Sequence, residues 1–172
     1  MTRKTPHDRL PVLLRAAARA RERAYAPYSG FRVGAAVLAE GRIHAAGNME
    51  NSSYPLSICA ERNAVAMAIA AGARRIDAVA IVGGTKRPAA PCGGCRQVLA
   101  EFASPDAPLV YASPDGRSVT TTVGALLPSS FGPDDVMGAA AGSMSTLRGP
   151  SGSSRSAARS RGTRSSGRRR SP

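Results

Sequence analysis

The sequence has no tryptophan, and aromatic residues make up only 4% of its 172 residues. No uninterrupted apolar run approaches the roughly 18 residues that a membrane-spanning helix needs. The first ten residues, MTRKTPHDRL, also lack the apolar core of a secretory signal. We therefore expect a soluble, cytoplasmic protein without a membrane partner.

Cysteine and histidine are scarce as well, with three cysteines and two histidines in the whole chain. Cys59, Cys92 and Cys95 are odd in number, which argues against a disulfide framework and for a reducing compartment where thiolates can hold metal. Taken alone, the Cys-x-x-Cys pair would also suit a redox motif or half of a structural zinc site. His44 lies in a predicted hairpin, where a surface position is more common than a fourth metal ligand.

The formal net charge of +13 is unevenly distributed along the chain. Residues 138–172 contain eight arginines, no lysine and no acidic residue, which leaves a charge of +5 for residues 1–137. The 138–172 segment is rich in Arg, Ser and Gly and has few large apolar residues, so we expect a disordered tail. It is either a solvated extension or an arm that contacts nucleic acid or an acidic partner without specificity.

Residues 1–137 alternate between helical and extended patterns and are expected to form one catalytic domain. Apolar residues recur at helical spacing in residues 6–25 and 59–71, and again after Pro91. Short apolar or β-branched runs bounded by turn residues predict the strands. These runs are residues 31–38, 42–46, 76–83, 109–112 and 119–123. The pattern predicts an α/β fold in which helices pack on a mixed sheet of about five strands.

Two cysteine-containing segments, Cys59-Ala60-Glu61 and Pro91-Cys92-Gly93-Gly94-Cys95, each open a predicted helix. Three thiolates can therefore converge at two helix N-termini, where the partial positive charge lowers thiol pKa values. Three thiolates bind zinc strongly and leave the fourth tetrahedral position open for water. Glu61 lies about 200° around the helix from Cys59, so it is better placed to transfer protons beside that water than to bind the metal.

A cysteine-x-glutamate followed by proline-cysteine-x-x-cysteine matches the signature of zinc-dependent deaminases. The blocks AYAPYSGFRVGAAV, GNMENSSYPLSICAERNA, PCGGCRQVLAEF and LLPSSFGPDD resemble those of the small, homotetrameric cytidine deaminases, in the same order, from about Ala24 to about Asp134. The resemblance implies a cytidine deaminase-like α/β/α fold. It also implies hydrolysis of cytidine and deoxycytidine to uridine and deoxyuridine, with release of ammonia.

The same resemblance assigns one zinc ion per subunit to the three cysteines and proton transfer to Glu61. It assigns hydrogen bonds with the ribose to Asn48 and Glu50. The Glu50 carboxylate can accept hydrogen bonds from ribose hydroxyls and would repel a phosphate, which favours free nucleosides over nucleotides. Asn48 could instead be only a turn residue after Gly47.

Three aromatic residues are also assigned by resemblance. Phe31 is expected to pack against the pyrimidine ring, whereas Tyr54 and Phe131 are expected to reach the nucleoside of a neighbouring subunit in a homotetramer with shared active sites. An unplaced phenylalanine is by default a core residue, and this alternative stays open for Phe31 and Phe131.

Arg62, next to the catalytic glutamate, is expected to act on the metal centre. Three thiolates with Zn²⁺ carry a net charge of −1, which should make the bound water a weaker acid. We expect the Arg62 guanidinium to donate hydrogen bonds to the thiolates and so restore the acidity. An Arg62→Ala variant should keep the fold but lose activity or zinc.

Two other functions fit part of the pattern. A deaminase of another aminopyrimidine nucleoside, such as blasticidin S, would share the metal signature, but the NMEN and LLPSSFGP blocks favour cytidine. A zinc-containing nucleic-acid-binding protein would use the basic tail. The chain has no aromatic residue beyond Phe131, so the tail lacks groups on which bases could stack.

Overall fold

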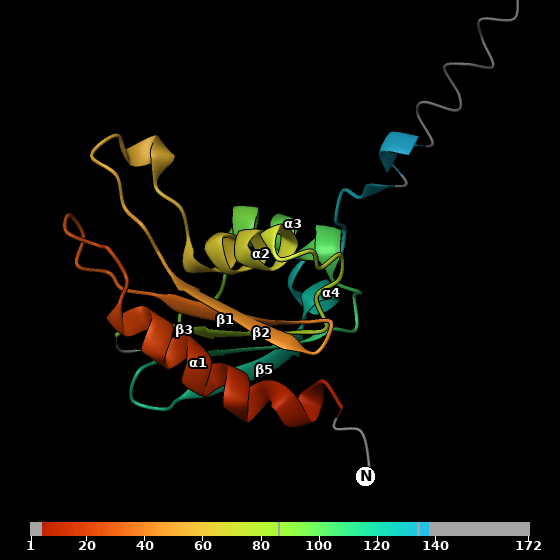
Figure 1. Ribbon diagram of the computed structural model, residues 1–172, viewed down its shortest axis with the longest axis horizontal. Coiled ribbons are helices and arrows are strands. Elements are labelled where there is room, and N and C mark those ends of the chain that lie inside the picture. Colours follow the sequence, from red (N-terminus) through yellow and green to blue (C-terminus); the bar gives the residue numbers. More distant parts are fainter. Residues whose placement is uncertain (1–4, 86, 134, 138–172) are drawn as a thin grey trace, which may run out of the picture. The chain divides into compact units, whose positions relative to one another are not determined.

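The computed structural model describes residues 5–85, 87–133 and 135–137 (Figure 1). By its internal contacts the chain divides into two units, Met1–Asp135 and Val136–Pro172. The tail expected over residues 138–172 lies outside the described residues. Among those that are described, no helix has the length and apolar character required to cross a membrane.

A mixed five-stranded sheet forms the centre of the first unit (Figure 1). The strands are β1 (Gly34–Ala39), β2 (Arg42–Gly47), β3 (Ala78–Val82), β4 (Pro108–Ala112) and β5 (Ser118–Thr122). Their order in the sheet is β2-β1-β3-β4-β5; β3 and β4 run parallel, and the other neighbours run antiparallel. The predicted mixed sheet of about five strands is confirmed.

Helices cover both faces of this sheet (Figure 1). The helical elements are η1 (His7–Arg9), α1 (Leu10–Glu22), η2 (Tyr54–Leu56), α2 (Ala60–Ala70), α3 (Gly93–Phe102) and α4 (Val123–Leu126). Because side chains alternate along a strand, Ala36 and Leu38 of β1 pack with the buried residues of α1. Ala35 and Val37 pack with those of α2 and α3 on the other face. The result is the expected α/β/α arrangement.

The first strand begins three residues later than the sequence pattern predicts, at Gly34 and not at Phe31. The Asn48 side chain provides the physical reason. Its carbonyl oxygen accepts a hydrogen bond from the Val33 amide at 2.8 Å, and its amide donates to the Phe31 carbonyl at 3.0 Å. A side chain thus bonds to the backbone where regular strand pairing would otherwise continue.

The end of the last predicted strand also differs. Val123 starts the short helix α4, because the Thr122 hydroxyl accepts a hydrogen bond from the Ala125 amide and caps the turn. Before α3, Pro91 lies one residue ahead of the helix cap formed by Cys92, so the helix begins after Pro91 as predicted.

Two paired glycines allow α1 to lie directly on the sheet. Gly34 of β1 is the register partner of Gly47 of β2. A Cβ atom added at Gly34 would overlap the Ala17 carbonyl oxygen and the Arg21 backbone nitrogen, and one at Gly47 would lie 2.7 Å from the Ala24 Cα. Glycine is therefore required at this contact, which fixes the end of α1 and the segment that follows it.

We expect Gly34→Ala to lower the free energy of unfolding by about 1–3 kcal/mol, because the added methyl group must push α1 away from the sheet. Urea unfolding would measure the loss. Gly132→Ala is the matched control, since an added Cβ there meets no atom within 4 Å. Equal stability of the two variants would contradict the close packing of α1 on β1.

Candidate active site

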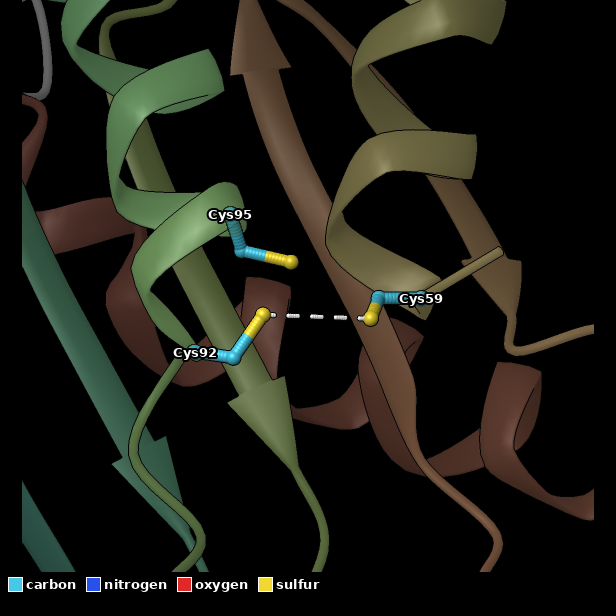
Figure 2. Close-up of side chains that lie close together, drawn as sticks. All are labelled: Cys59, Cys92 and Cys95. Atoms are coloured by element: carbon cyan, nitrogen blue, oxygen red, sulfur yellow. Dashed lines mark hydrogen bonds between the residues drawn. The ribbon is translucent and has the colours of Figure 1, made fainter. Parts of the chain in front are cut away.

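The three cysteines lie at the starts of two helices on one face of the sheet. Cys59 is the cap residue before α2, Cys92 is the cap residue before α3, and Cys95 lies in the first turn of α3. Figure 2 shows their side chains converging from the two helix starts. All three Sγ atoms lie within 4.8 Å of one another, and those of Cys59 and Cys92 are 4.0 Å apart. The chain thus brings the three sequence-predicted metal ligands together.

This geometry fits a zinc ion. A tetrahedral centre with Zn–S bonds of about 2.3 Å separates two sulfur atoms by about 3.8 Å, close to the observed spacing. No histidine or carboxylate from the described part of the chain joins the cluster, and His44 lies in β2. Three protein ligands and one open position are typical of a catalytic zinc site, whereas a structural site has four.

The electrostatics of the cluster also favour a divalent cation. A hydrogen bond from Cys95, and weaker ones from Cys92 and Arg62, lower the pKa of Cys59 to about 5. Their effect is larger than that of burial, which by itself would raise this pKa. The hydrogen bond with Cys59, together with burial, raises the pKa of Cys95. One thiolate therefore keeps its neighbour protonated, and a dication at the shared centre is what would allow all three sulfurs to ionise.

Glu61, in the first turn of α2, lies beside the cysteines and is only 5% exposed. Burial raises the pKa of its carboxyl group, and the nearby Cys59 charge acts in the same direction. Glu61, Cys59 and Cys92 line one cavity of about 160 Å³, whose wall is otherwise largely apolar. Pockets for drug-sized ligands measure about 300–1,000 Å³, so this space suits a single small ring.

Phe31 and Asn48 line the same cavity from the side of β1 and β2. Phe31 is 46% exposed and is therefore not a core residue. The Asn48 side chain holds the backbone on both sides of Arg32 through its bonds to Phe31 and Val33. A carboxamide has two N–H groups and an oxygen with two lone pairs, so Asn48 keeps capacity for a ligand after making these two bonds.

Glu50 organises the turn that follows α1. Its carboxylate accepts hydrogen bonds from the Tyr28 amide at 2.9 Å, the Ser29 amide at 3.2 Å and the Ser29 hydroxyl. The Ser29 hydroxyl is the main cause of the lowered pKa of Glu50. Glu50 also lines a second cavity of about 120 Å³. This cavity shares Asn48 and Cys59 with the first, so the two spaces adjoin.

We expect the Glu50 interactions to make stability depend on pH. Because the folded-state pKa lies below the ordinary value of 4.5, the stabilisation is present above pH 4.5 and is lost as pH falls through the lower folded-state pKa. Glu50→Gln should be less stable than the parent at pH 7, and the difference should shrink below pH 4.5. Urea unfolding across this range tests it, with the exposed Glu22→Gln as control. A constant difference at every pH would contradict the assigned role.

Arg62 lies next to Cys59. Its Nη2 donates to the Ser57 carbonyl oxygen at 3.2 Å. Its hydrogen bond and its positive charge both lower the pKa of Cys59. The Nε atom is buried and has no hydrogen-bond partner within the part of the chain that the structure describes. The guanidinium thus carries unused donor capacity beside the sulfur cluster.

The other two predicted aromatic residues lie on the surface. Tyr54, in η2, is 61% exposed and lines the second cavity. Phe131 is 63% exposed, and its carbonyl oxygen accepts a hydrogen bond from Gln97 Nε2 of α3 at 2.6 Å. In this single subunit Phe131 does not line the cavity that contains Glu61.

Several residues of the site were missed by sequence reasoning. Ser29 donates to Glu50, and Val33, Ile81, Ala89 and Ala90 contribute to the wall of the first cavity. Small or aliphatic residues that line a pocket carry no pattern that distinguishes them from core residues. The turn residues before Phe31 offered the one available signal for Ser29, since a serine in a turn often bonds to nearby groups.

Comparisons with known proteins agree with this geometry. Residues 9–111 match the family model for the cytidine and deoxycytidylate deaminase zinc-binding region. The chain is 47% identical to the cytidine deaminase of Sporosarcina psychrophila over 123 residues. This alignment covers 71% of this chain and 90% of that protein. It is 44% identical to the cytidine deaminase of Halalkalibacterium halodurans over 126 residues. This alignment covers 73% of this chain and 96% of that protein.

Solved structures give the same result. The crystal structure of cytidine deaminase from Burkholderia pseudomallei matches with a TM-score of 0.68 at 47% identity, over 70% of this chain and 98% of that chain. The cytidine deaminase from Mycobacterium tuberculosis matches with a TM-score of 0.61 at 40% identity. The match covers 71% of this chain and 96% of that chain. The resemblance seen in the sequence is confirmed: this chain belongs to the cytidine and deoxycytidylate deaminase family.

Proposed function

We propose that the chain catalyses the zinc-dependent hydrolytic deamination of cytidine and deoxycytidine. The products are uridine or deoxyuridine and ammonia. The observation that carries the proposal is the cavity of about 160 Å³ in which Glu61 lies together with Cys59 and Cys92. The cytidine deaminases among the relatives support the choice of substrate.

The sulfur atoms of Cys59, Cys92 and Cys95 would hold the zinc ion. When bound there, zinc supplies a Lewis acid that lowers the pKa of a water molecule toward neutrality. Glu61 is then the residue that moves protons. Its carboxylate accepts a proton from the water that attacks C4 of the ring and delivers it to N3. A further proton transfer to the amine allows it to leave as ammonia.

The remaining contacts position the nucleoside. Phe31, half-exposed at the rim of the cavity, would pack against the pyrimidine ring. Asn48 and Glu50 line the adjoining cavity, where they would form hydrogen bonds with the ribose hydroxyls. The Glu50 charge would also repel a phosphate, and therefore free nucleosides should be better substrates than nucleotides.

Arg62 would increase the acidity of the zinc-bound water through its contact with the cysteine ligands. Three thiolates overcompensate the charge of Zn²⁺, which weakens its effect on water. The Arg62 guanidinium, already beside Cys59 and with its Nε unpartnered among the described residues, would donate to a thiolate and withdraw part of this charge.

We further propose a homotetramer in which neighbouring subunits complete each site. The surface positions of Tyr54 and Phe131 support this arrangement, because large exposed aromatic side chains are common at subunit interfaces. The three free cysteines suit a reducing compartment, which supports a cytoplasmic location.

The activity can be tested with purified protein. We expect cytidine and deoxycytidine to lose their characteristic ultraviolet absorbance with stoichiometric release of ammonia, and a zinc chelator should stop the reaction. Cytidylate and blasticidin S should react far more slowly than cytidine. If zinc-loaded protein released ammonia from blasticidin S and not from cytidine, the substrate assignment would be wrong. If it released ammonia from none of these compounds, the deaminase proposal would fail.

A further inference from the structure

The start of α3 carries two of the three cysteines and has little helical stability of its own. Its first two residues are Gly93 and Gly94, and glycine loses more conformational freedom in a helix than any other residue. The Cys92 side chain, at the cap position, forms no capping hydrogen bond with the helix. Cys92 is also exposed, so burial contributes little to its position. Another contact must therefore hold Cys92 where Figure 2 shows it, facing the other two sulfur atoms.

Arg96, in the second turn of α3, supplies this contact. Its Nε donates a hydrogen bond to the Pro91 carbonyl oxygen at 2.8 Å, and its Nη1 donates to the Leu126 carbonyl oxygen at 3.1 Å. The Pro91 carbonyl belongs to the peptide group that joins Pro91 to Cys92, so the first bond restrains the Cys92 backbone. Leu126 is the last residue of α4, where carbonyl groups lack partners within their own helix. One rigid, planar guanidinium thus connects the approach to Cys92 with a second element of the fold.

The start of α2 contains the same arrangement. Arg62 donates from Nη2 to the Ser57 carbonyl oxygen at 3.2 Å. Each of the two arginines lies five residues after the carbonyl group to which it donates, and each carbonyl lies just before the cysteine that caps the helix. Arg62 also lowers the pKa of Cys59, whereas Arg96 is not among the main influences on the pKa of Cys59 or Cys95. Arg96 therefore affects the cluster through geometry and not through its charge.

We infer that Arg96 is a positioning residue, which holds Cys92 where its sulfur can share one metal ion with Cys59 and Cys95. This role rests on the zinc site of the function proposed above. The two glycines after Cys92 would otherwise allow it to move away from the other sulfur atoms before the metal binds. The two hydrogen bonds of Arg96 reduce this freedom. Ligands that are held in place beforehand bind more tightly, because less conformational entropy is lost on binding.

The test measures the zinc affinity of the full chain by competition with a chromophoric chelator, in the parent, Arg96→Met and Arg96→Lys. Methionine removes the charge and the donors, whereas lysine keeps the charge but lacks the planar group that donates to two carbonyl oxygens in fixed directions. Both variants should bind zinc about 10–100-fold more weakly, the usual effect of losing a residue that orients a metal ligand. Co²⁺ in place of zinc gives a second readout, since its thiolate charge-transfer absorption should weaken if Cys92 binds less fully.

Gln97→Ala is the matched control. Gln97 is the next residue of α3, and its side chain donates to the Phe131 carbonyl oxygen, in the segment after α4. Its zinc affinity should equal that of the parent. An equal loss of affinity in Gln97→Ala and Arg96→Lys would assign the effect to the segment after α4 and overturn the inference.

Two other results would also overturn it. Parent affinity in Arg96→Lys would show that a positive charge is sufficient. A lower Tm of the metal-free Arg96 variants with unchanged zinc affinity would show a structural role alone. If Arg96→Met does not fold, the milder Arg96→Lys decides the question. A parent that binds no zinc would instead contradict the proposed function, whereas equal affinity of the parent and the Arg96 variants would leave that function intact.

Discussion

Glu61→Gln is expected to abolish turnover of cytidine while the fold and the zinc content stay unchanged. Glutamine has the same shape as glutamate and fits the same buried position, but its amide cannot carry a proton between water, N3 and the leaving amine. General acid–base catalysis by one side chain contributes about 10²–10⁴-fold to rate, and Glu61 is proposed to act in more than one proton transfer. The loss in kcat should therefore reach at least the upper end of this range.

Single-turnover assays and zinc analysis of the same preparation would measure this effect. Glu101→Gln, an exposed glutamate on α3, removes the same charge away from the cavity and should keep full activity. The affinity of Glu61→Gln for uridine should be close to that of the parent, because product binding requires no proton transfer. A Glu61→Gln enzyme with more than a tenth of the parent kcat would show that another group transfers the protons.

Cys95→Ala is expected to lose both zinc and activity. Cys95 is fully buried between the two helix starts, and its sulfur is one of the three that converge there. Two remaining thiolates would leave the zinc ion without the third protein ligand that catalytic sites have. The variant should contain well under one zinc per subunit after purification, and its turnover should fall to background.

Thermal unfolding separates this loss of metal from a simple packing defect. A ligand that binds only the folded protein raises its stability, so added zinc should raise the Tm of the metal-free parent and leave that of Cys95→Ala unchanged. Cys95→Ser preserves more of the volume and serves as the second variant. If Cys95→Ala retained one zinc per subunit, Cys95 could not be one of the ligands.

The central elements of the fold could be predicted because their signals are local. Helical periodicity located α1 and α2, and Gly72, which follows α2, adopts a φ of +97° that suits a glycine after a helix end. The metal cluster could also be predicted, because each cysteine segment follows an extended segment and starts a helix, and helix starts that follow strands running in the same direction meet at one edge of a sheet. Cys59 and Cys92 are 33 positions apart in the sequence, yet the local pattern was sufficient to predict that they meet.

The remaining features depend on contacts between distant residues, which no local pattern records. The delayed start of β1 results from the side chain of Asn48, and the low pKa of Glu50 results from Ser29, twenty-one residues away. Likewise, the need for glycine at position 34 appears only when α1 is laid on the sheet. Sequence reasoning identified Asn48 and Glu50 by resemblance, but the bonds that hold them could be seen only in three dimensions.

The two hydrogen bonds that Asn48 makes with Phe31 and Val33 have an implication for how the enzyme could evolve. The same carboxamide supports the aromatic rim and borders the space proposed for the sugar. A replacement that improves binding of a different sugar would therefore also displace the Phe31 ring, which is proposed to pack on the base. Selectivity for the base and selectivity for the sugar thus depend on the same Asn48 side chain. A change of sugar preference should therefore require compensating mutations around residues 31–33.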